Sequence, residues 1–351
     1  QGAGVLVPVD PFKLNDYSTE TPTSFEFIYK YKGIKYIYGF SATKEKICEE
    51  YLYHYPKGFR AQVFKRTGQE FSFIQDKAFK QLISKAVAEN QLYFSVANTM
   101  NESVCAEAMK FFTESIVFSR EFEDLPGQIR LNYHNNNVLK SMKQYAQRAD
   151  VGITDMKFEM KNTEIDVDDT IPEDAPPELS RALKSFVSAL SDNSQVKIQR
   201  NEIKARTYHT GISKNGEISQ YELGLEDESD GTLRLMALAA AIDRTIDNGG
   251  IFVADELEKG LHPLLTEYIV NKFQNSEINK NNAQLIFTTH DTEIMRQHFL
   301  DADQFYFVDK DRQTGESELY SVDGLGKKNN ADIRTGYLIG KFGGVPELGD
   351  E

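Results

Sequence analysis

The chain has 351 residues, 40% of them hydrophobic and 27% charged, which is ordinary for a globular protein and long enough for two lobes. Its formal net charge of −14 disfavours a surface that coats DNA broadly, although a local basic patch remains compatible with it. It has two distant cysteines, no apolar run near the roughly 20 residues of a membrane span, and no signal-peptide pattern. These features predict a cytoplasmic protein without a disulfide framework or a membrane segment.

Aromatic and polar residues alternate in the first part of the chain. Phe25, Phe27 and Tyr29 are separated by polar or aliphatic residues, and Lys32-Gly33 suits a tight hairpin turn. The pattern predicts an antiparallel β lobe within residues 1–75. A half-buried sheet explains the aromatic residues better than a platform for stacking bases.

Helical spacing replaces this alternation in residues 76–153, which we predict to be a helical insertion. Apolar residues recur at intervals of three and four over 102–116, and a second helix is expected over 138–148. Residues 154–195 predict one strand, an acidic linker and an amphipathic helix. Residues 196–323 form the predicted core, and 324–351 are expected to be a tail.

The most informative stretch of the core is a short apolar strand that ends in two acids. Ile251-Phe252-Val253-Ala254 follows a glycine pair and is predicted to be a parallel strand buried on both faces. Asp255 and Glu256 come directly after it, at the edge where open α/β sheets bind ligands. Two neighbouring carboxylates suit Mg²⁺ chemistry, in which Asp255 holds the metal and Glu256 orients and deprotonates a water. A strand that ends in solvated acids is the alternative.

Two flanking stretches favour the chemical interpretation. Upstream, Ser229-Asp230-Gly231-Thr232 opens an amphipathic helix, and a small glycine-containing helix start presents backbone N–H groups to an anion. Downstream, a second apolar strand at 284–287 is followed by Thr288-Thr289-His290. A histidine there can donate a hydrogen bond to a terminal phosphate or hold an attacking water. Each stretch alone also fits a structural role, as a helix cap or a strand-end histidine.

In this order the three motifs resemble those of ABC/SMC-type ATPase heads. They are most similar to the AAA ATPases of bacterial abortive-infection and anti-phage systems, relatives of the overcoming-lysogenization-defect ATPases. The resemblance rests on Ser-Asp-Gly-Thr, Asp-Glu-Leu-Glu-Lys-Gly-Leu-His-Pro and Phe-Thr-Thr-His-Asp. It implies an α/β fold, a mixed sheet flanked by helices with an antiparallel β lobe and a short helical insertion. It also implies ATP and Mg²⁺ as ligands, with Asp255 at the metal, and Glu256 and His290 as catalytic residues.

The resemblance further implies a head-to-tail homodimer with two composite ATP sites. The Ser229–Thr232 stretch of one copy would then meet the acids of the other across the γ-phosphate. In such a switch ATP joins the copies and hydrolysis releases them, and this often controls a nuclease or toxin partner. The expected function is therefore an ATP-hydrolysing dimerisation switch in anti-phage defence.

Members of this family carry a phosphate loop of the form G-x-x-x-x-G-K-[ST], and the sequence contains none. Gly324-Leu325-Gly326-Lys327 comes closest but lacks the Ser or Thr. Two explanations follow. We expect either that the phosphate loop lies in a segment before residue 1, or that the chain is a sensor or scaffold that does not hydrolyse ATP.

A third interpretation is a DNA-binding ATPase of the SMC or repair type, which requires a basic groove. Basic residues do cluster on one predicted strand, although a solvated strand face explains them better. They are Lys197, Arg200, Lys204 and Arg206.

Overall fold

The computed structural model describes residues 5–149, 152–165, 181, 185, 198–322 and 330–345. Its contacts divide the chain into two compact units, Gln1–Ile116 with Thr292–Glu351, and Val117–Asp291. The predicted acidic linker, most of the helix expected before residue 195, and Lys197 lie outside the described residues. None of the described helices is long and apolar enough to cross a membrane.

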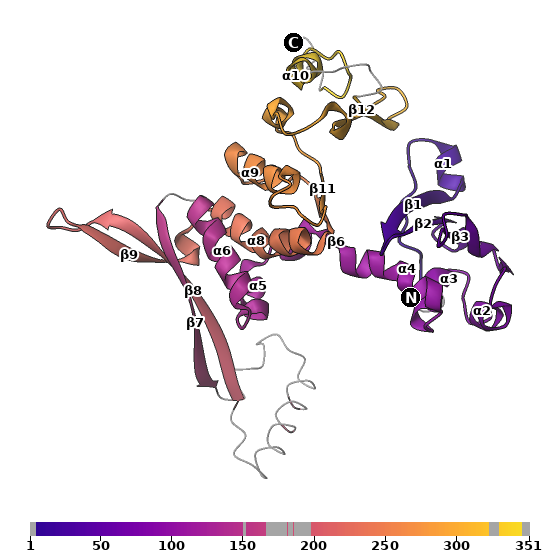
Figure 1. Cartoon of the computed structure of the whole chain (residues 1–351), viewed down its shortest axis with the longest axis horizontal. Coiled ribbons are helices and arrows are strands. Elements are labelled where there is room, and N and C mark those ends of the chain that lie inside the picture. Colours follow the sequence, from indigo (N-terminus) through magenta and orange to yellow (C-terminus); the bar gives the residue numbers. More distant parts are fainter. Residues whose placement is uncertain are drawn as a thin grey trace. The chain divides into compact units, whose positions relative to one another are not determined.

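The first unit contains an antiparallel sheet of five strands in sequential order (Figure 1). It confirms the antiparallel sheet that the alternation of aromatic and polar residues predicted. Lys32 and Gly33 both have positive φ angles, 46° and 83°, as the two-residue turn between the first two strands requires. The strands are β1 (Thr23–Tyr31), β2 (Ile34–Ala42), β3 (Ile47–His54), β4 (Ala61–Thr67) and β5 (Glu70–Ser72).

Three short helices, α2 (Lys77–Ser84), α3 (Tyr93–Thr99) and α4 (Ser103–Lys110), share a hydrophobic core with this sheet. The helix predicted over 102–116 is wrong at its end, because Phe111–Ser115 forms a π-helix that runs into β6 (Ile116–Phe118). The wider turn lets two consecutive rings pack on the same neighbour. Phe111 stacks on Tyr29 with 4.2 Å between ring centroids, and Phe112 meets Tyr29 edge-on at 5.2 Å.

A fully buried ion pair lies inside the β lobe. Arg66 Nη1 is 3.5 Å from Glu50 Oε2, and both side chains are 0% exposed. Glu50 also accepts hydrogen bonds from the backbone N–H groups of Tyr93 and Phe94, at 2.7 and 2.9 Å, and from the Tyr38 hydroxyl. Burial raises the pKa of Glu50 to about 7, although the two N–H groups and Arg66 act in the opposite direction.

The first unit also includes an N-terminal helix and the C-terminal segment. In the latter, Phe307 stacks on Tyr337 with 4.9 Å between ring centroids and packs against Phe342, which joins a hairpin to the last helix. These elements are α1 (Asp16–Glu20), β12 (Tyr306–Lys310), β13 (Ser317–Ser321) and α10 (Asn330–Leu338).

The second unit has two small sheets and several helices, of which α6 and α8 lie side by side (Figure 1). One sheet has the order β11-β10-β6 and the other β7-β8-β9. The strands are β7 (Ile153–Ile165), β8 (Ile198–Ile212), β9 (Ile218–Gly224), β10 (Ile251–Ala254) and β11 (Gln284–Phe287); the helices are α5 (Leu125–Asn132), α6 (Asn136–Ala149), α8 (Asp230–Asn248) and α9 (Pro263–Gln274).

Strands β10 and β11 are parallel, as predicted, but they are not buried on both faces. Phe252 and Ala254 are buried, whereas Ile251 and Val253 are half-buried and Ile286 on β11 is 57% exposed. The buried face is covered by α8 and α9, and the Phe252 ring packs against Phe273 of α9. Alternate residues of a strand point to opposite faces, so helices on one face bury only every second side chain.

Asp243 ties the helices of this unit together. Its carboxylate accepts hydrogen bonds from Ser141 and Tyr145 of α6, at 2.5 and 2.9 Å, and pairs with Lys272 of α9. Because Asp243 itself lies on α8, three helices share one polar contact. This fixes α8 relative to α6 and α9.

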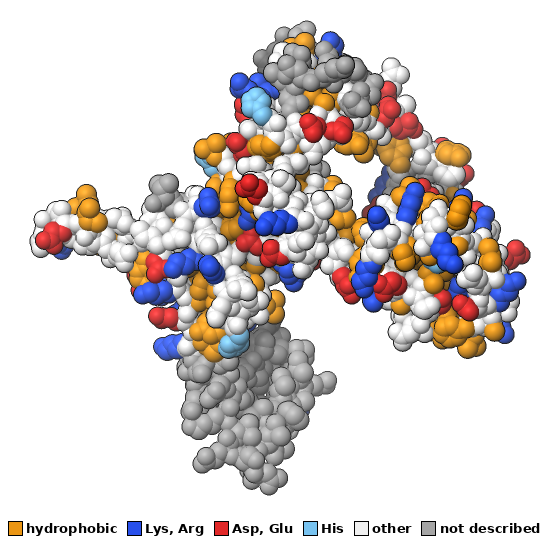
Figure 2. Space-filling view, in the orientation of Figure 1, with side chains coloured by type: hydrophobic (Ala, Val, Ile, Leu, Met, Phe, Trp, Pro, Cys, Tyr) orange, Lys and Arg blue, Asp and Glu red, His pale blue; other side chains and the backbone are white. Residues whose placement is uncertain are grey.

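The antiparallel pair of β7 and β8 has one apolar and one charged face. Met156 and Ala205 pack against Met236 of α8, while Lys204 is exposed and Arg206 lies 3.5 Å from Glu222 of β9. Basic and acidic side chains are interspersed on the face of the molecule that Figure 2 shows. This arrangement favours a solvated strand face over a continuous basic groove.

The buried Glu50 predicts a specific pH dependence of stability. Because its folded pKa of about 7 exceeds the usual value of 4.5 for a glutamate, the folded state holds the proton more tightly. The contribution of Glu50 to stability is therefore largest below pH 4.5 and falls as pH rises toward 7. We expect wild type to lose up to about 3 kcal/mol relative to Glu50→Gln across this range, measured by urea unfolding.

The exposed Glu70 provides the control, because Glu70→Gln removes a carboxylate from the same sheet without uncovering a buried charge. A difference between wild type and Glu50→Gln that stays constant from pH 4.5 to pH 7 would contradict the expectation.

Candidate functional site

The two predicted acids lie beside the residue that follows the neighbouring parallel strand. Ala254 pairs with Phe287, so Asp255 and Thr288 leave the sheet at the same edge. The Thr288 hydroxyl donates to Asp255 Oδ1 at 2.5 Å and lies 2.8 Å from the backbone nitrogen of Glu256, whose N–H it accepts. Both carboxylates are exposed. The structure therefore places the pair where the sequence predicted, and adds Thr288 as the side chain that holds both residues.

Glu256 has an uncommon backbone conformation for a residue other than glycine. Its φ angle is 48°, in the left-handed region, which costs on the order of 1 kcal/mol or more unless neighbours fix it. Thr288 binds its N–H, and Arg234 Nη2 donates to its carbonyl oxygen at 3.1 Å. Strained residues held on both sides are frequent at functional sites, which supports a chemical role for Glu256.

His290 lies next to Glu256, as expected for two groups that act together. Its Nε2 atom is 3.7 Å from Glu256 Oε1, and the imidazole is 86% exposed. Its backbone N–H donates to Glu258 Oε1 at 2.7 Å, so the start of the segment after β11 is fixed while the ring stays accessible. The imidazole can therefore reach a ligand at the carboxylate edge.

Glu258 is a site residue that the sequence analysis missed. Besides its bond to His290, its second oxygen, Oε2, is buried without a hydrogen-bond partner. Burial raises the pKa of this carboxyl, but hydrogen bonding, chiefly from the His290 N–H, outweighs burial and holds it below its usual value. The available signal was a third acid two residues after Glu256, in the run Asp-Glu-Leu-Glu.

The predicted helix start is confirmed at α8. Ser229 is the N-cap, and its Oγ accepts the Thr232 N–H at 3.1 Å, while Asp230 occupies the first turn. A Cβ on Gly231 would lie 2.2 Å from the Gly260 carbonyl oxygen. Only glycine lets this helix start approach the loop that follows the acids so closely.

Glu228 anchors the same helix start to strand β8. Its side chain is 3% exposed, accepts a hydrogen bond from Thr207 and lies 2.8 Å from His209 Nε2, both on β8. Pairwise side-chain contacts between distant segments leave no pattern in the sequence, so this anchor was also missed.

The carboxylates fit a magnesium ion that is bound together with phosphate. Within the described part of the chain, no group of three or more His, Cys, Asp or Glu side chains gathers to hold a metal ion by itself. Mg²⁺ usually takes one or two carboxylates and completes its shell with water and substrate phosphates. An exposed Asp255 beside Glu256 meets that requirement.

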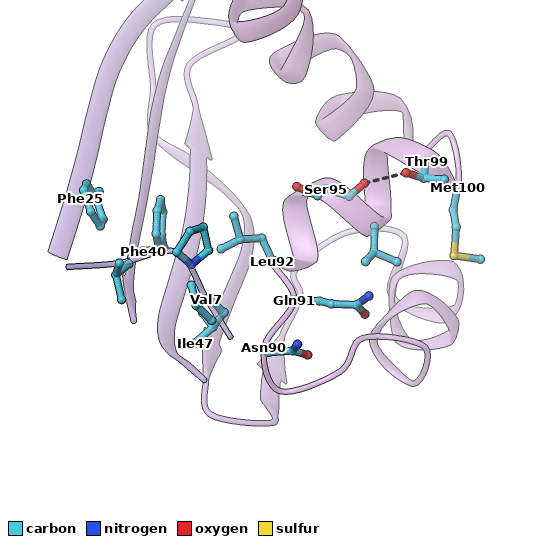
Figure 3. Close-up of a pocket in the computed structure, with 13 residues that line it drawn as sticks. Val7, Phe25, Phe40, Ile47, Asn90, Gln91, Leu92, Ser95, Thr99 and Met100 are labelled. Atoms are coloured by element: carbon cyan, nitrogen blue, oxygen red, sulfur yellow. Dashed lines mark hydrogen bonds between the residues drawn. The ribbon is translucent and has the colours of Figure 1, made fainter. Parts of the chain in front are cut away.

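A cavity of about 590 Å³ lies in the first unit, and its lining rules it out as the phosphate site. Figure 3 shows apolar side chains around it, among them Val7, Phe40 and Leu92, with Ser95 and Thr99 on one helix. None of its lining residues is acidic, basic or a histidine, so it cannot neutralise phosphate or hold Mg²⁺. The carboxylate edge is therefore the candidate site.

The chain has similarity to known proteins. A family model described as "AAA domain, putative AbiEii toxin, Type IV TA system" matches residues 1–296. The "Retron Vc95 probable ATPase" of Vibrio cholerae serotype O1 biovar El Tor is 33% identical over 119 residues, which are 32% of this chain and 21% of that protein. The chain thus matches about a fifth of that relative's length.

Among solved structures, the recombination mediator protein RecF with ATP, from the RecFOR pathway, is 13% identical to this chain. The match covers 82% of this chain and 80% of that one, with a TM-score of 0.25.

Gly231→Ala tests the close approach of α8 to the loop. Replacing a helical glycine by alanine normally stabilises a protein by up to about 1 kcal/mol. Here the added Cβ meets a backbone carbonyl, so we expect a loss of about 1–3 kcal/mol in the free energy of unfolding, measured with urea. The sign of the change in the free energy of unfolding is decisive. A variant more stable than wild type would mean that Gly231 does not approach the Gly260 carbonyl this closely.

Proposed function

Because the chain belongs to the AAA-domain family of AbiEii-type ATPases, we propose that it is the core of an ATP-hydrolysing dimerisation switch that controls an effector in anti-phage defence. The observation that carries this proposal is the carboxylate edge. Asp255 and Glu256 end a parallel strand, share Thr288 and lie beside the exposed His290. This is an arrangement suited to phosphoryl transfer to water.

Each residue of the edge has a defined task in this proposal. Asp255 holds Mg²⁺, which when bound neutralises charge on the phosphates. Glu256 orients the attacking water and accepts its proton, which is the work of a general base. His290 donates a hydrogen bond to the terminal phosphate, for which its exposed imidazole is free to reorient. Thr288 binds the carboxylate of Asp255 and the backbone N–H of Glu256, and so holds the two residues in place.

The start of α8 supplies the second half of a composite site. Helix N-termini bind anions through their free N–H groups and the helix dipole. In the stretch Ser229-Asp230-Gly231-Thr232, the backbone of Gly231 can approach a phosphate closely because it has no side chain. We propose that this stretch contacts the γ-phosphate of ATP bound to a second copy, so that ATP joins a homodimer.

The partner and the compartment are part of the same proposal. The effector is a nuclease or toxin released or activated by the change between joined and separated copies. We place the switch in the cytoplasm, because Cys48 and Cys105 are both free thiols.

A non-hydrolysing sensor or scaffold is the second candidate. A DNA-binding ATPase is less well supported, because the basic residues of β8 whose side chains are described lie near acids: Lys204 pairs in register with Glu159, and Arg206 lies 3.5 Å from Glu222.

Glu256→Gln separates the two main candidates. In the full-length protein we expect this variant to bind ATP, to hydrolyse it at least about a hundredfold more slowly than wild type, and to accumulate as a dimer. Light scattering on a sizing column, with and without ATP and Mg²⁺, measures the dimer fraction.

Glu277→Gln serves as the control, because Glu277 is an exposed acid of the same unit. Equal dimer fractions for Glu256→Gln with and without ATP would contradict the switch, and unchanged defence in that variant would favour the scaffold.

A further inference from the structure

Arg234 connects the start of α8 with the loop that follows the two acids. It lies in the second turn of α8, and its guanidinium donates to the carbonyl oxygens of Glu256, at 3.1 Å, and Lys259. The planar guanidinium has five donors in a rigid fork, so one side chain can hold two carbonyls of the same loop. Its side chain is half-buried, which limits competition from water.

The first of these carbonyls matters most, because it belongs to a residue whose backbone is strained. Glu256 is in the left-handed region, and its two peptide groups are held by different side chains. Thr288 binds its N–H from the end of β11, and Arg234 binds its carbonyl from α8. Release of either contact frees the backbone to relax, and the direction of the Glu256 carboxylate changes with it.

The contact of Arg234 with backbone oxygens distinguishes it from an ordinary ion pair. Burial lowers the pKa of Arg234, while the charges of Glu123, Glu258 and Glu256 act in the opposite direction. Those carboxylates compensate its charge, but its described hydrogen bonds go to carbonyl groups. The guanidinium therefore fixes the backbone geometry of the loop that follows β10. Gly231 adds a second connection, because it packs against the Gly260 carbonyl in the same loop.

We propose that Arg234 is a positioning residue that couples the phosphate-facing start of α8 to the backbone of Glu256. A phosphate that engages the helix start then tightens the hold of Arg234 on the loop, so that the working orientation of Glu256 is populated most fully when the helix is engaged. Hydrolysis would thereby depend on the second copy even though the coupling lies within one chain. The inference rests on the proposed function, because it concerns how that same site is regulated.

The test compares Arg234→Ala, Arg234→Lys and the control Arg244→Ala in the full-length protein. Arg244 is an exposed arginine about three turns further along α8. The first readout is amide hydrogen exchange of the segment 255–261 without nucleotide. In wild type the Leu257 N–H donates to Thr288 and the Lys259 N–H to the Glu256 carbonyl. We expect Arg234→Ala to exchange these amides at least about fivefold faster.

The second readout is steady-state ATP hydrolysis. We expect Arg234→Ala to lower kcat about tenfold or more while KM changes less than about threefold, because a charged hydrogen bond is lost away from the ligand. Arg234→Lys should lie between, because an ammonium cannot span both carbonyls in a fixed plane. Arg244→Ala should match wild type in both readouts.

Wild-type exchange of the segment in Arg234→Ala, or a kcat loss equal to that of Arg244→Ala, would overturn the inference. Should Arg234→Ala not fold, Arg234→Lys carries the same test, and wild-type values for it in both readouts would overturn the inference as well. If wild type hydrolyses no ATP and Glu256→Gln changes nothing, the proposed function fails instead. The exchange measurement still decides whether Arg234 holds the loop.

Discussion

The parallel pairing of β10 with β11 is the constraint on which the candidate site depends. Its register sets Ala254 opposite Phe287, so the residues that follow the two strands leave the sheet at one edge. Asp255 and Thr288 meet there through a hydrogen bond of 2.5 Å. A shift of one residue in either strand would turn these side chains to opposite faces. The burial of Phe252 against α8 and α9 opposes such a shift, because it would expose a large ring.

This register has a further consequence for the backbone. Because Thr288 accepts the N–H of Glu256 while donating to Asp255, one hydroxyl satisfies two neighbouring residues. The chain can then turn sharply at Glu256 in a left-handed conformation that would otherwise be unfavourable. The turn leads directly into the close contact between Gly231 and Gly260. Site geometry therefore follows from strand pairing, and the local preferences of the residues in the loop do not determine it.

Sequence patterns predicted the parts of the site that arise from local chemistry. The Ser229 cap, the strand that delivers Asp255 and Glu256, and the histidine after β11 all follow from short-range rules. The rules gave the wrong result where tertiary contacts outweigh periodicity. Phe111–Ser115 continues an apolar helical pattern, yet it forms a π-helix because two consecutive rings pack on Tyr29. Similarly, a run of four apolar residues predicted burial on both faces, while helices cover one face of β10.

The residues that sequence reasoning missed are those that hold the backbone through side chains. Arg234, Thr288 and Glu258 are ordinary polar residues in their segments, and their partners are 22 to 32 positions away. Nothing in composition or spacing specifies which backbone group such a side chain will meet, because the answer depends on the packing of α8 against the sheet.

The fixed and adaptable parts of the second unit are separated along α8. Behind its start, the buried Glu228 bonds to β8, and further along the helix Asp243 bonds to α6 and pairs with α9. These contacts are buried or half-buried and hold the helix along its length. The acids beyond β10 are exposed, and their loop is tied to the helix by Arg234 and one glycine contact. A ligand at this edge therefore acts on the loop first, because the loop has fewer contacts to break than the helix. A switch built on this unit would change the direction of Glu256 before it moves any element of the core.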